Sequence, residues 1–217
     1  REDEDAAALV AKALARDGID CRMATTLVAV SSESGLHRLE LASGQALEAE
    51  RILVAAGRAV GLEKLGLERA GIAWGRSGVV VNDRMATTNA RVFACGDVSS
   101  TPYMLTQAAD AEARLVLRNA LFRGRARASR LVIPWCTYTS PELAHVGIGQ
   151  DEARSMAGVE TITVGAEQVD RFVVENDSEG FLRVHVKGAR GKILGATIVG
   201  TQAGELIATI SLAMKAG

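Results

Sequence analysis

The chain has no long apolar run. No stretch approaches the roughly 20 residues that a membrane-spanning helix needs. Its opening residues, Arg1 to Asp5, are acidic where a secretory signal would be basic and then apolar. The sequence therefore predicts no membrane partner and a cytoplasmic protein.

Cysteine is scarce and scattered. Cys21, Cys95 and Cys136 are odd in number and far apart, so they match neither a disulfide framework nor a C-x-x-C metal or redox pair. We therefore predict three reduced, mostly buried thiols and no metal site.

An excess of charge of one sign is also absent. The net charge is −1, with 48% hydrophobic and 24% charged residues, which is typical of a soluble globular protein and not of a polyanion binder. Nucleic acid is not an expected partner. The 217 residues suffice for one large domain or two modest ones.

The first part of the chain has an α/β pattern. Asp5 to Arg16 has the alanine-rich spacing of a surface helix, and Thr25 to Ser31 and Leu36 to Ala42 have the pattern of strands. Arg51 to Arg58 is a short apolar run, the form of a strand buried on both faces of a parallel sheet.

The pattern continues to a basic segment. Gly78 to Asn82 and Arg91 to Asp97 are predicted strands, and an alanine-rich helix is expected over about Met104 to Phe122. Arg123 to Arg130 is basic and irregular, so we expect an exposed domain boundary there.

The last part changes to an α+β pattern. Leu182, Val184 and Val186 alternate with polar residues, as in a strand of an antiparallel sheet, and Gly188 to Gly191 turns into a second strand. From Ala203 the apolar positions recur at helical spacing. The predicted fold is α/β segments followed by an α+β domain with an antiparallel sheet.

The most informative stretch is the end of the strand at Gly96 and Asp97. Glycine lets the backbone approach a ligand, and ligands of open α/β sheets bind beyond the carboxyl ends of strands. Asp97 could accept a hydrogen bond from a ligand hydroxyl, or it could only cap the next turn. The small residues early in the next helix, such as Ala108 and Ala109, would admit a flat ring, and a helix N-terminus favours negative charge.

Several ordered motifs together resemble the FAD-dependent pyridine nucleotide-disulfide oxidoreductases, especially the mercuric reductase and dihydrolipoamide dehydrogenase group. Ile52 to Arg58 is similar to their small-x-Gly-Arg strand end, Thr88 to Asp97 to their second FAD motif, and Thr139 to Gly147 to the start of their dimerisation domain. Glu179-Gly180-Phe181 and Ala203-Gly204-Glu205 continue the match in the same order. The resemblance spans essentially the whole chain.

This resemblance implies FAD and NAD(P)H as cofactors and assigns residues to them. Asp97, after Gly96, would bind the FAD ribityl chain, and Gly57 would touch the nicotinamide nucleotide. The start of the helix would meet the flavin ring through Met104, Leu105, Thr106 and Gln107.

The resemblance also divides the chain. Residues 1–57 would be the second half of the NAD(P)-binding domain, residues 58–127 the returning part of the FAD domain, and residues 128–217 the interface domain of a homodimer. Both ends of the sequence look cut, so the chain is expected to be a C-terminal fragment.

Four family motifs are missing from the sequence. The two G-x-G-x-x-G fingerprints and the C-x-x-x-x-C redox pair would precede Arg1, and the histidine segment that serves the partner subunit would follow Gly217. His37, His145 and His185 do not match that segment and are interpreted as structural or surface residues. No catalytic residue is therefore expected in the chain, which alone should be inactive.

Two functions remain open. The parent enzyme would pass hydride from NAD(P)H to FAD and then electrons to a small acceptor, which could be a disulfide, a metal ion or another molecule. The chain could instead be a non-catalytic dimerisation module. Ile133 to Thr139 and the Asp170-Arg171 pair resemble mercuric reductase-like proteins more than glutathione reductase.

Overall fold

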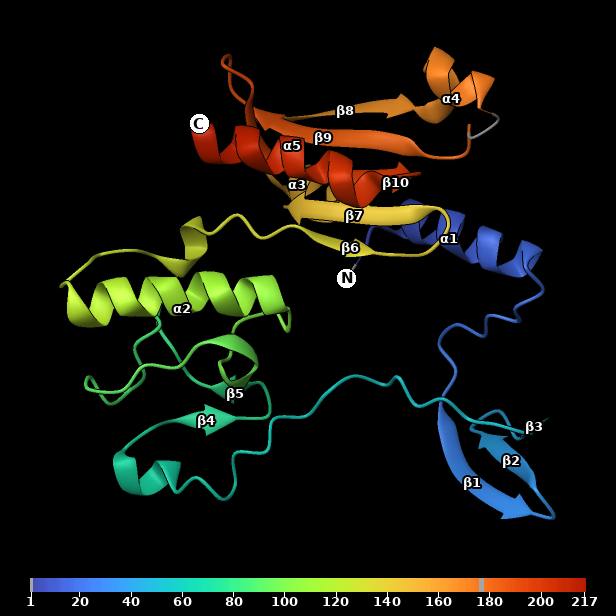
Figure 1. Ribbon diagram of the computed structural model, residues 1–217, viewed down its shortest axis with the longest axis horizontal. Helices are drawn as coiled ribbons and strands as arrows, with labels where there is room; N and C mark the ends of the chain where they lie inside the picture. Colours follow the sequence, from blue (N-terminus) through green and yellow to red (C-terminus); the bar gives the residue numbers. More distant parts are fainter. Residues whose placement is uncertain (1, 176–177) are drawn as a thin grey trace. The chain divides into compact units, whose positions relative to one another are not determined.

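The computed structural model describes residues 2–175 and 178–217 and divides them into two units (Figure 1). The smaller unit comprises residues 14–59, and the larger comprises residues 2–13 with 60–217. Helices occur together with antiparallel sheets, which confirms the predicted fold class.

The smaller unit contains one antiparallel sheet of three strands, in the order β1-β2-β3. These are β1 (Leu27–Glu33), β2 (Leu36–Leu41) and β3 (Ala46–Ala49). Ser34 and Gly35 join the first two strands and both have positive φ, as a two-residue hairpin turn requires. The two strands predicted here are confirmed, with the first shifted by two residues.

The strand predicted over Arg51 to Arg58 is not formed, so that prediction was wrong. Residues 51–60 have no regular secondary structure, and the side chains of Leu53 and Val54 are 91% and 81% exposed. A parallel strand exists only by bonding to parallel neighbours. Among the residues that the structure describes, no two strands pair in parallel.

The larger unit begins with most of helix α1 (Glu4–Arg16), up to residue 13, and continues from residue 60 through a loop-rich stretch. Its named elements are the two-stranded sheet of β4 (Trp74–Gly75) and β5 (Gly78–Val79) and the 3-10 turns η1 (Leu67–Ala70) and η2 (Gly96–Val98).

Two strand predictions in this stretch were wrong. The strand predicted over Gly78 to Asn82 shrinks to Gly78–Val79, and the one over Arg91 to Asp97 becomes a single bridge between Phe93 and Ala86. Without a continuous neighbour the apolar residues pack against each other as a small cluster, centred on Leu62, Ile72 and Val79. The predicted long helix is confirmed as α2 (Thr106–Leu121).

The C-terminal part is built on one antiparallel sheet of five strands, in the order β6-β7-β10-β9-β8 (Figure 1). The predicted α+β pattern with an antiparallel sheet is confirmed for this part of the chain. The elements are η3 (Ala128–Arg130), β6 (Trp135–Thr137), β7 (Glu142–Gly147), α3 (Gln150–Ser155), β8 (Val159–Gly165), η4 (Ala166–Gln168), α4 (Asp170–Val174), β9 (Phe181–Lys187), β10 (Lys192–Gly200) and α5 (Ala203–Ala216).

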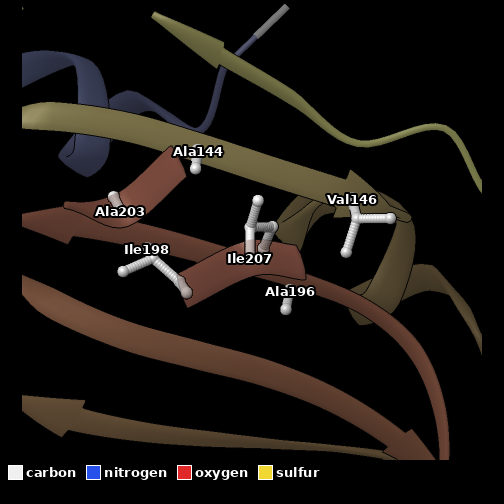
Figure 2. Packing of buried hydrophobic residues seen from close by; sticks show 6 residues of the cluster. All are labelled: Ala144, Val146, Ala196, Ile198, Ala203 and Ile207. Carbon is white, nitrogen blue, oxygen red and sulfur yellow. The ribbon is translucent and has the colours of Figure 1, made fainter. Parts of the chain in front are cut away.

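One face of this sheet forms an apolar core with helix α5 (Figure 2). Successive residues of a strand point to opposite faces, so Ala144 and Val146 of β7 and Ala196 and Ile198 of β10 share this face. Ile207 of α5 is 3% exposed and packs on them. Burying such a side chain stabilises the fold by about 1.5–3 kcal/mol.

The opposite face combines apolar packing with buried charge, and the start of the chain covers it. Ala6, Leu9 and Val10 of α1 pack there against Leu143, Phe181 and Val199 of the sheet. Arg183 of β9 is 7% exposed in its side chain and forms ion pairs with Asp3, at 3.3 Å, and with Asp5. Asp3 also accepts a hydrogen bond of 2.9 Å from the backbone N–H of Gln150, at the start of α3. Buried charges are tolerated only when paired, so this face depends on residues 2–13.

Each of the three histidines lies within hydrogen-bond distance of a hydroxyl group, which is consistent with the predicted structural role. His145 lies 2.8 Å from the Thr197 hydroxyl, His185 lies 2.9 Å from that of Thr161, and the more exposed His37 bonds Ser32. His185 is fully buried, and this burial lowers its pKa. Arg183, through its hydrogen bond, likewise lowers the pKa of Asp5.

The three cysteines are free thiols, as predicted. Cys95 and Cys136 are half-buried, but Cys21 is exposed, so the prediction of a mostly buried thiol was wrong there. Cys21 lies in a stretch of the smaller unit where residues 17–36 are all exposed. Over the described residues, no helix has the length and apolar character needed to cross a membrane.

We predict that the melting temperature falls as the pH drops below about 6.5, where the unfolded chain takes up a proton at His185 before the folded chain does. A second loss is expected to begin at about pH 4, where the unfolded chain takes up a proton at Asp5 before the folded chain does, because Arg183 lowers the pKa of Asp5 in the folded chain. Thermal unfolding from pH 7.5 to 3.5 would measure both.

His185→Asn, which can keep the bond to Thr161, should remove the first loss, and Asp5→Asn the second. His37→Asn is the matched control, because His37 lies on the exposed hairpin. A wild-type pH profile that His185→Asn leaves unchanged would contradict the assignment.

Candidate cofactor site

The backbone turns sharply at Gly96, at the start of η2. Gly96 has a φ of +72°, and a Cβ placed there would lie 3.1 Å from the Cβ of Ala109 on α2. Only glycine combines this left-handed conformation with such a close approach. The turn is thereby held against the first turns of α2.

A buried carboxylate fixes this contact. Glu112 of α2 is 2% exposed, and its Oε2 accepts a hydrogen bond of 2.7 Å from the backbone N–H of Gly96. Burial, together with the charge of Glu112, raises the pKa of the Cys95 thiol. The turn and the helix are therefore joined by a charge-assisted bond that cannot shift without leaving a buried charge unpaired.

Asp97 lies directly after this bond, within η2, and is half-buried. Ser99, which is 2% exposed, closes the turn by donating a hydrogen bond of 2.7 Å to the carbonyl of Gly96. The backbone on both sides of Asp97 is thus fixed. A carboxylate held in this way can accept hydrogen bonds without reorganising.

Helix α2 begins at Thr106, ten residues after Gly96. Its N-cap residue is Leu105, and no side chain caps the helix, so the first N–H groups are left for water or a ligand. Met104 and Thr106 are exposed. Gln107 donates a hydrogen bond of 3.1 Å to the carbonyl of Pro134, which ties the helix start to the strand β6 region.

The residues of the second FAD motif that precede the turn form hydrogen bonds that stabilise a neighbouring loop. The Thr88 hydroxyl donates to the carbonyl of Gly71 and accepts from the N–H of Ala73. The Asn89 amide donates to the carbonyl of Ala70 at 2.7 Å. These bonds pin the loop around residues 70–73 and do not themselves form a ligand site.

The structure therefore groups some predicted site residues. Gly96 and Asp97 lie in the turn η2, which packs on the helix that begins with Thr106 and Gln107. Gly57 belongs to the smaller unit, where it has a φ of +93° and open space around its Cα. Cofactor binding by any of these residues stays a prediction.

Glu112 was missed by the sequence reading. It shares the buried face of α2 with Ala108 and Leu115, at the spacing i, i+4, i+7. A buried carboxylate needs a hydrogen-bond partner. The position of Glu112 on the apolar face of the predicted helix was therefore the signal that could have identified it.

We predict that Glu112→Ala lowers the free energy of unfolding by about 1.5–3 kcal/mol, because the Gly96 amide loses a charged acceptor. Glu112→Gln keeps an acceptor oxygen and should cost less than about half of that. Urea denaturation measures both, with Glu160→Ala on the exposed side of β8 as the control. Equal losses for the alanine and glutamine variants would count against the bond.

Two family models match the chain. Residues 1–113 match the pyridine nucleotide-disulphide oxidoreductase model, and residues 133–217 match the dimerisation domain of the same family. The predicted resemblance is therefore confirmed.

Individual relatives of the chain are also oxidoreductases of this kind. A dihydrolipoyl dehydrogenase of Thermus scotoductus is 37% identical over 99% of this chain and 48% of its own length. A mercuric reductase of Bacillus cereus is 30% identical over 99% of this chain and 35% of its own length. The solved HOCl-induced flavoprotein disulfide reductase RclA of Escherichia coli is similar at a TM-score of 0.84 and 27% identity, over 100% of this chain and 50% of that one. The chain thus spans half or less of the length of these relatives. It belongs to the pyridine nucleotide-disulphide oxidoreductase family of oxidoreductases.

Proposed function

We propose that the chain is the C-terminal half of an FAD-dependent oxidoreductase that takes hydride from NAD(P)H and passes electrons to a small acceptor. The observation that carries this proposal is the Gly96–Asp97 turn, which Glu112 locks against α2. The family match over residues 1–113 supports the cofactor assignment.

The residues of the turn and the helix fit part of a flavin site. The turn that presents Asp97 is fixed on both sides, so its carboxylate would accept a hydrogen bond from a ribityl hydroxyl. The uncapped start of α2, with Met104, Leu105 and Thr106, would meet the flavin ring and favour negative charge on it. When bound, FAD supplies the hydride and electron transfer chemistry.

Gln107 and Gly57 have separate proposed roles. The Gln107 side chain bonds the Pro134 carbonyl, so it would contact the flavin through its backbone while it fixes the helix start. Gly57, which has positive φ and open space around its Cα, would let the backbone approach the nicotinamide nucleotide.

Exposed apolar side chains support the proposal that further protein covers this chain. Leu53 and Val54 in the smaller unit, Leu121 at the end of α2 and Phe122 just after it are all more than two-thirds exposed. Monomeric soluble proteins rarely leave such groups together in water. In the proposed division, residues 1–57 complete a nicotinamide domain, 58–127 a flavin domain and 128–217 the interface of a homodimer in the cytoplasm.

The electron acceptor is proposed only as a class: a disulfide, a metal ion or another small molecule. Relatives of this chain include enzymes named for dihydrolipoamide and for mercuric ion. Ile133 to Thr139 and Asp170-Arg171 favour the mercuric reductase-like group. The alternative, a non-catalytic dimerisation module, would need no flavin site, so flavin binding at Asp97 separates the two.

We predict that Asp97→Ala in the full-length parent raises the FAD dissociation constant by about one to two powers of ten. A loss of this size is expected because the substitution removes one hydrogen bond to a charged group. The measurement is the FAD dissociation constant of the purified variant, alongside the melting temperature of the apoprotein.

Asp110→Ala is the matched control, because Asp110 is an exposed carboxylate on the same helix that pairs with Arg114. Its FAD constant should stay within about a factor of two of the parent. If Asp97→Ala lowers apoprotein stability and leaves the FAD constant unchanged, Asp97 is a turn cap and the assignment is wrong.

A further prediction is that the chain self-associates through residues 128–217. An apolar hollow of about 330 Å³ lies at the end of the five-stranded sheet beside α5, and the half-exposed Leu206 lines it. We expect sedimentation to show a dimer at micromolar concentration and Leu206→Glu to weaken it.

Leu65→Glu introduces the same charge at an exposed leucine outside this domain and should leave the dimer intact. A strictly monomeric species over a wide concentration range would contradict the prediction. So would equal effects of the two substitutions.

A further inference from the structure

The C-terminal end of α2 and the segment after it are densely cationic. From Ala113 to Pro141 the sequence has no acidic residue and six arginines. Five of these, Arg114, Arg118, Arg125, Arg127 and Arg130, line a hollow of about 530 Å³. That volume is within the range of small-molecule sites.

The segment is folded back on the helix by specific bonds. The Asn119 side chain bonds the backbone of Ala126 in both directions, donating to its carbonyl and accepting from its N–H, each at 2.9 Å. Gly124 donates to the carbonyl of Arg118, and a Cβ on Gly124 would lie 2.7 Å from that oxygen. The loop that carries Arg125 therefore has a fixed place beside Arg118.

The far end of the segment is fixed as well. Asp83 accepts hydrogen bonds from both the N–H and the hydroxyl of Ser129, at 2.7 and 3.0 Å. The Ser129 N–H bond is the main reason that the pKa of Asp83 is lowered. Arg127 and Arg130, on either side of Ser129, are thereby held at the rim of the hollow.

The arginines are only partly neutralised. Arg114 pairs with Asp110, and Arg127 lies 3.9 Å from Asp83. In the described part of the chain, Arg118 and Arg125 form no ion pair. A cation near a helix C-terminus offsets the helix dipole, which accounts for Arg118 but not for Arg125, which is outside the helix.

The floor of the hollow is apolar. It is formed by Ala111 and the buried Leu115 of α2 together with Ala126 and Leu131. Guanidinium groups bind phosphate oxygens in pairs of hydrogen bonds, and an apolar floor suits a flat ring. The hollow therefore offers two kinds of contact that a nucleotide can use at once.

We propose that this hollow binds a nucleoside diphosphate, with the diphosphate held by Arg118 and Arg125 and the base on the apolar floor. This site is separate from the Gly96–Asp97 turn and the start of α2. Its existence does not depend on the proposed flavin chemistry.

Isothermal titration of the 217-residue chain with ADP, and separately with pyrophosphate, tests the proposal. We expect one saturable ADP site with a dissociation constant of about 0.1 mM at low salt, weakened by added salt. The pair of substitutions Arg118→Ala and Arg125→Ala should weaken ADP binding at least about tenfold. Pyrophosphate should bind more weakly than ADP, because it cannot use the floor.

Two controls distinguish specific binding in the hollow from nonspecific electrostatic attraction of ADP to arginines. Arg76→Ala with Arg190→Ala removes the same charge from exposed positions elsewhere and should change the constant less than about twofold. Gly124→Ala keeps every arginine but displaces the loop, so it should weaken binding while circular dichroism shows a folded chain.

Several results would overturn the proposal. These are no saturable ADP binding up to about 5 mM, ADP binding that survives loss of Arg118 and Arg125, and equal losses in the two arginine pairs. ADP bound elsewhere, for example at a nicotinamide site, would be insensitive to Arg118 and Arg125 and would count against it. Pyrophosphate binding as tight as ADP would contradict the role of the floor.

Discussion

The hydrogen bond from the Gly96 amide to the buried carboxylate of Glu112 is the constraint on which the candidate flavin site depends. It sets where the chain turns and how closely the turn approaches α2, and it requires glycine at position 96. Asp97 and the uncapped helix start take their places from it. Because a buried carboxylate without a donor is strongly unfavourable, the turn and the helix are ordered together.

The two faces of the five-stranded sheet are covered by different parts of the chain. The face toward α5 is a closed apolar core that needs only residues of the C-terminal part (Figure 2). The other face buries Arg183, His145 and His185 and needs the carboxylates of Asp3 and Asp5. The beginning of the chain is thus joined to the sheet by these ion pairs and also by the apolar contacts of α1 with Leu143, Phe181 and Val199.

The sequence predicted the elements whose stability is local or antiparallel. The β1–β2 hairpin, helix α2 and strands β9 and β10 follow from turn residues and periodicity, and they appear as expected. The runs at Arg51 to Arg58 and Arg91 to Asp97 have strand-like composition, but the described residues offer them no parallel strand to bond. Composition carries no information on the neighbouring strand.

In the candidate site, too, local features could be predicted from the sequence and tertiary contacts could not. Gly96 and Asp97 could be singled out from a motif, whereas the role of Glu112 could not, because its partner is a backbone amide 16 residues away. The arginine-lined hollow was visible in the sequence only as a basic segment. The bonds of Asn119 and Asp83 that shape it depend on tertiary structure.

The most direct test of the central claim is the visible absorbance of the purified full-length parent under anaerobic conditions. The account predicts that the protein retains FAD in proportion to its polypeptide and that NADH or NADPH bleaches the oxidised flavin. A folded parent that neither retains nor binds FAD, or whose bound flavin neither nucleotide reduces, would contradict it.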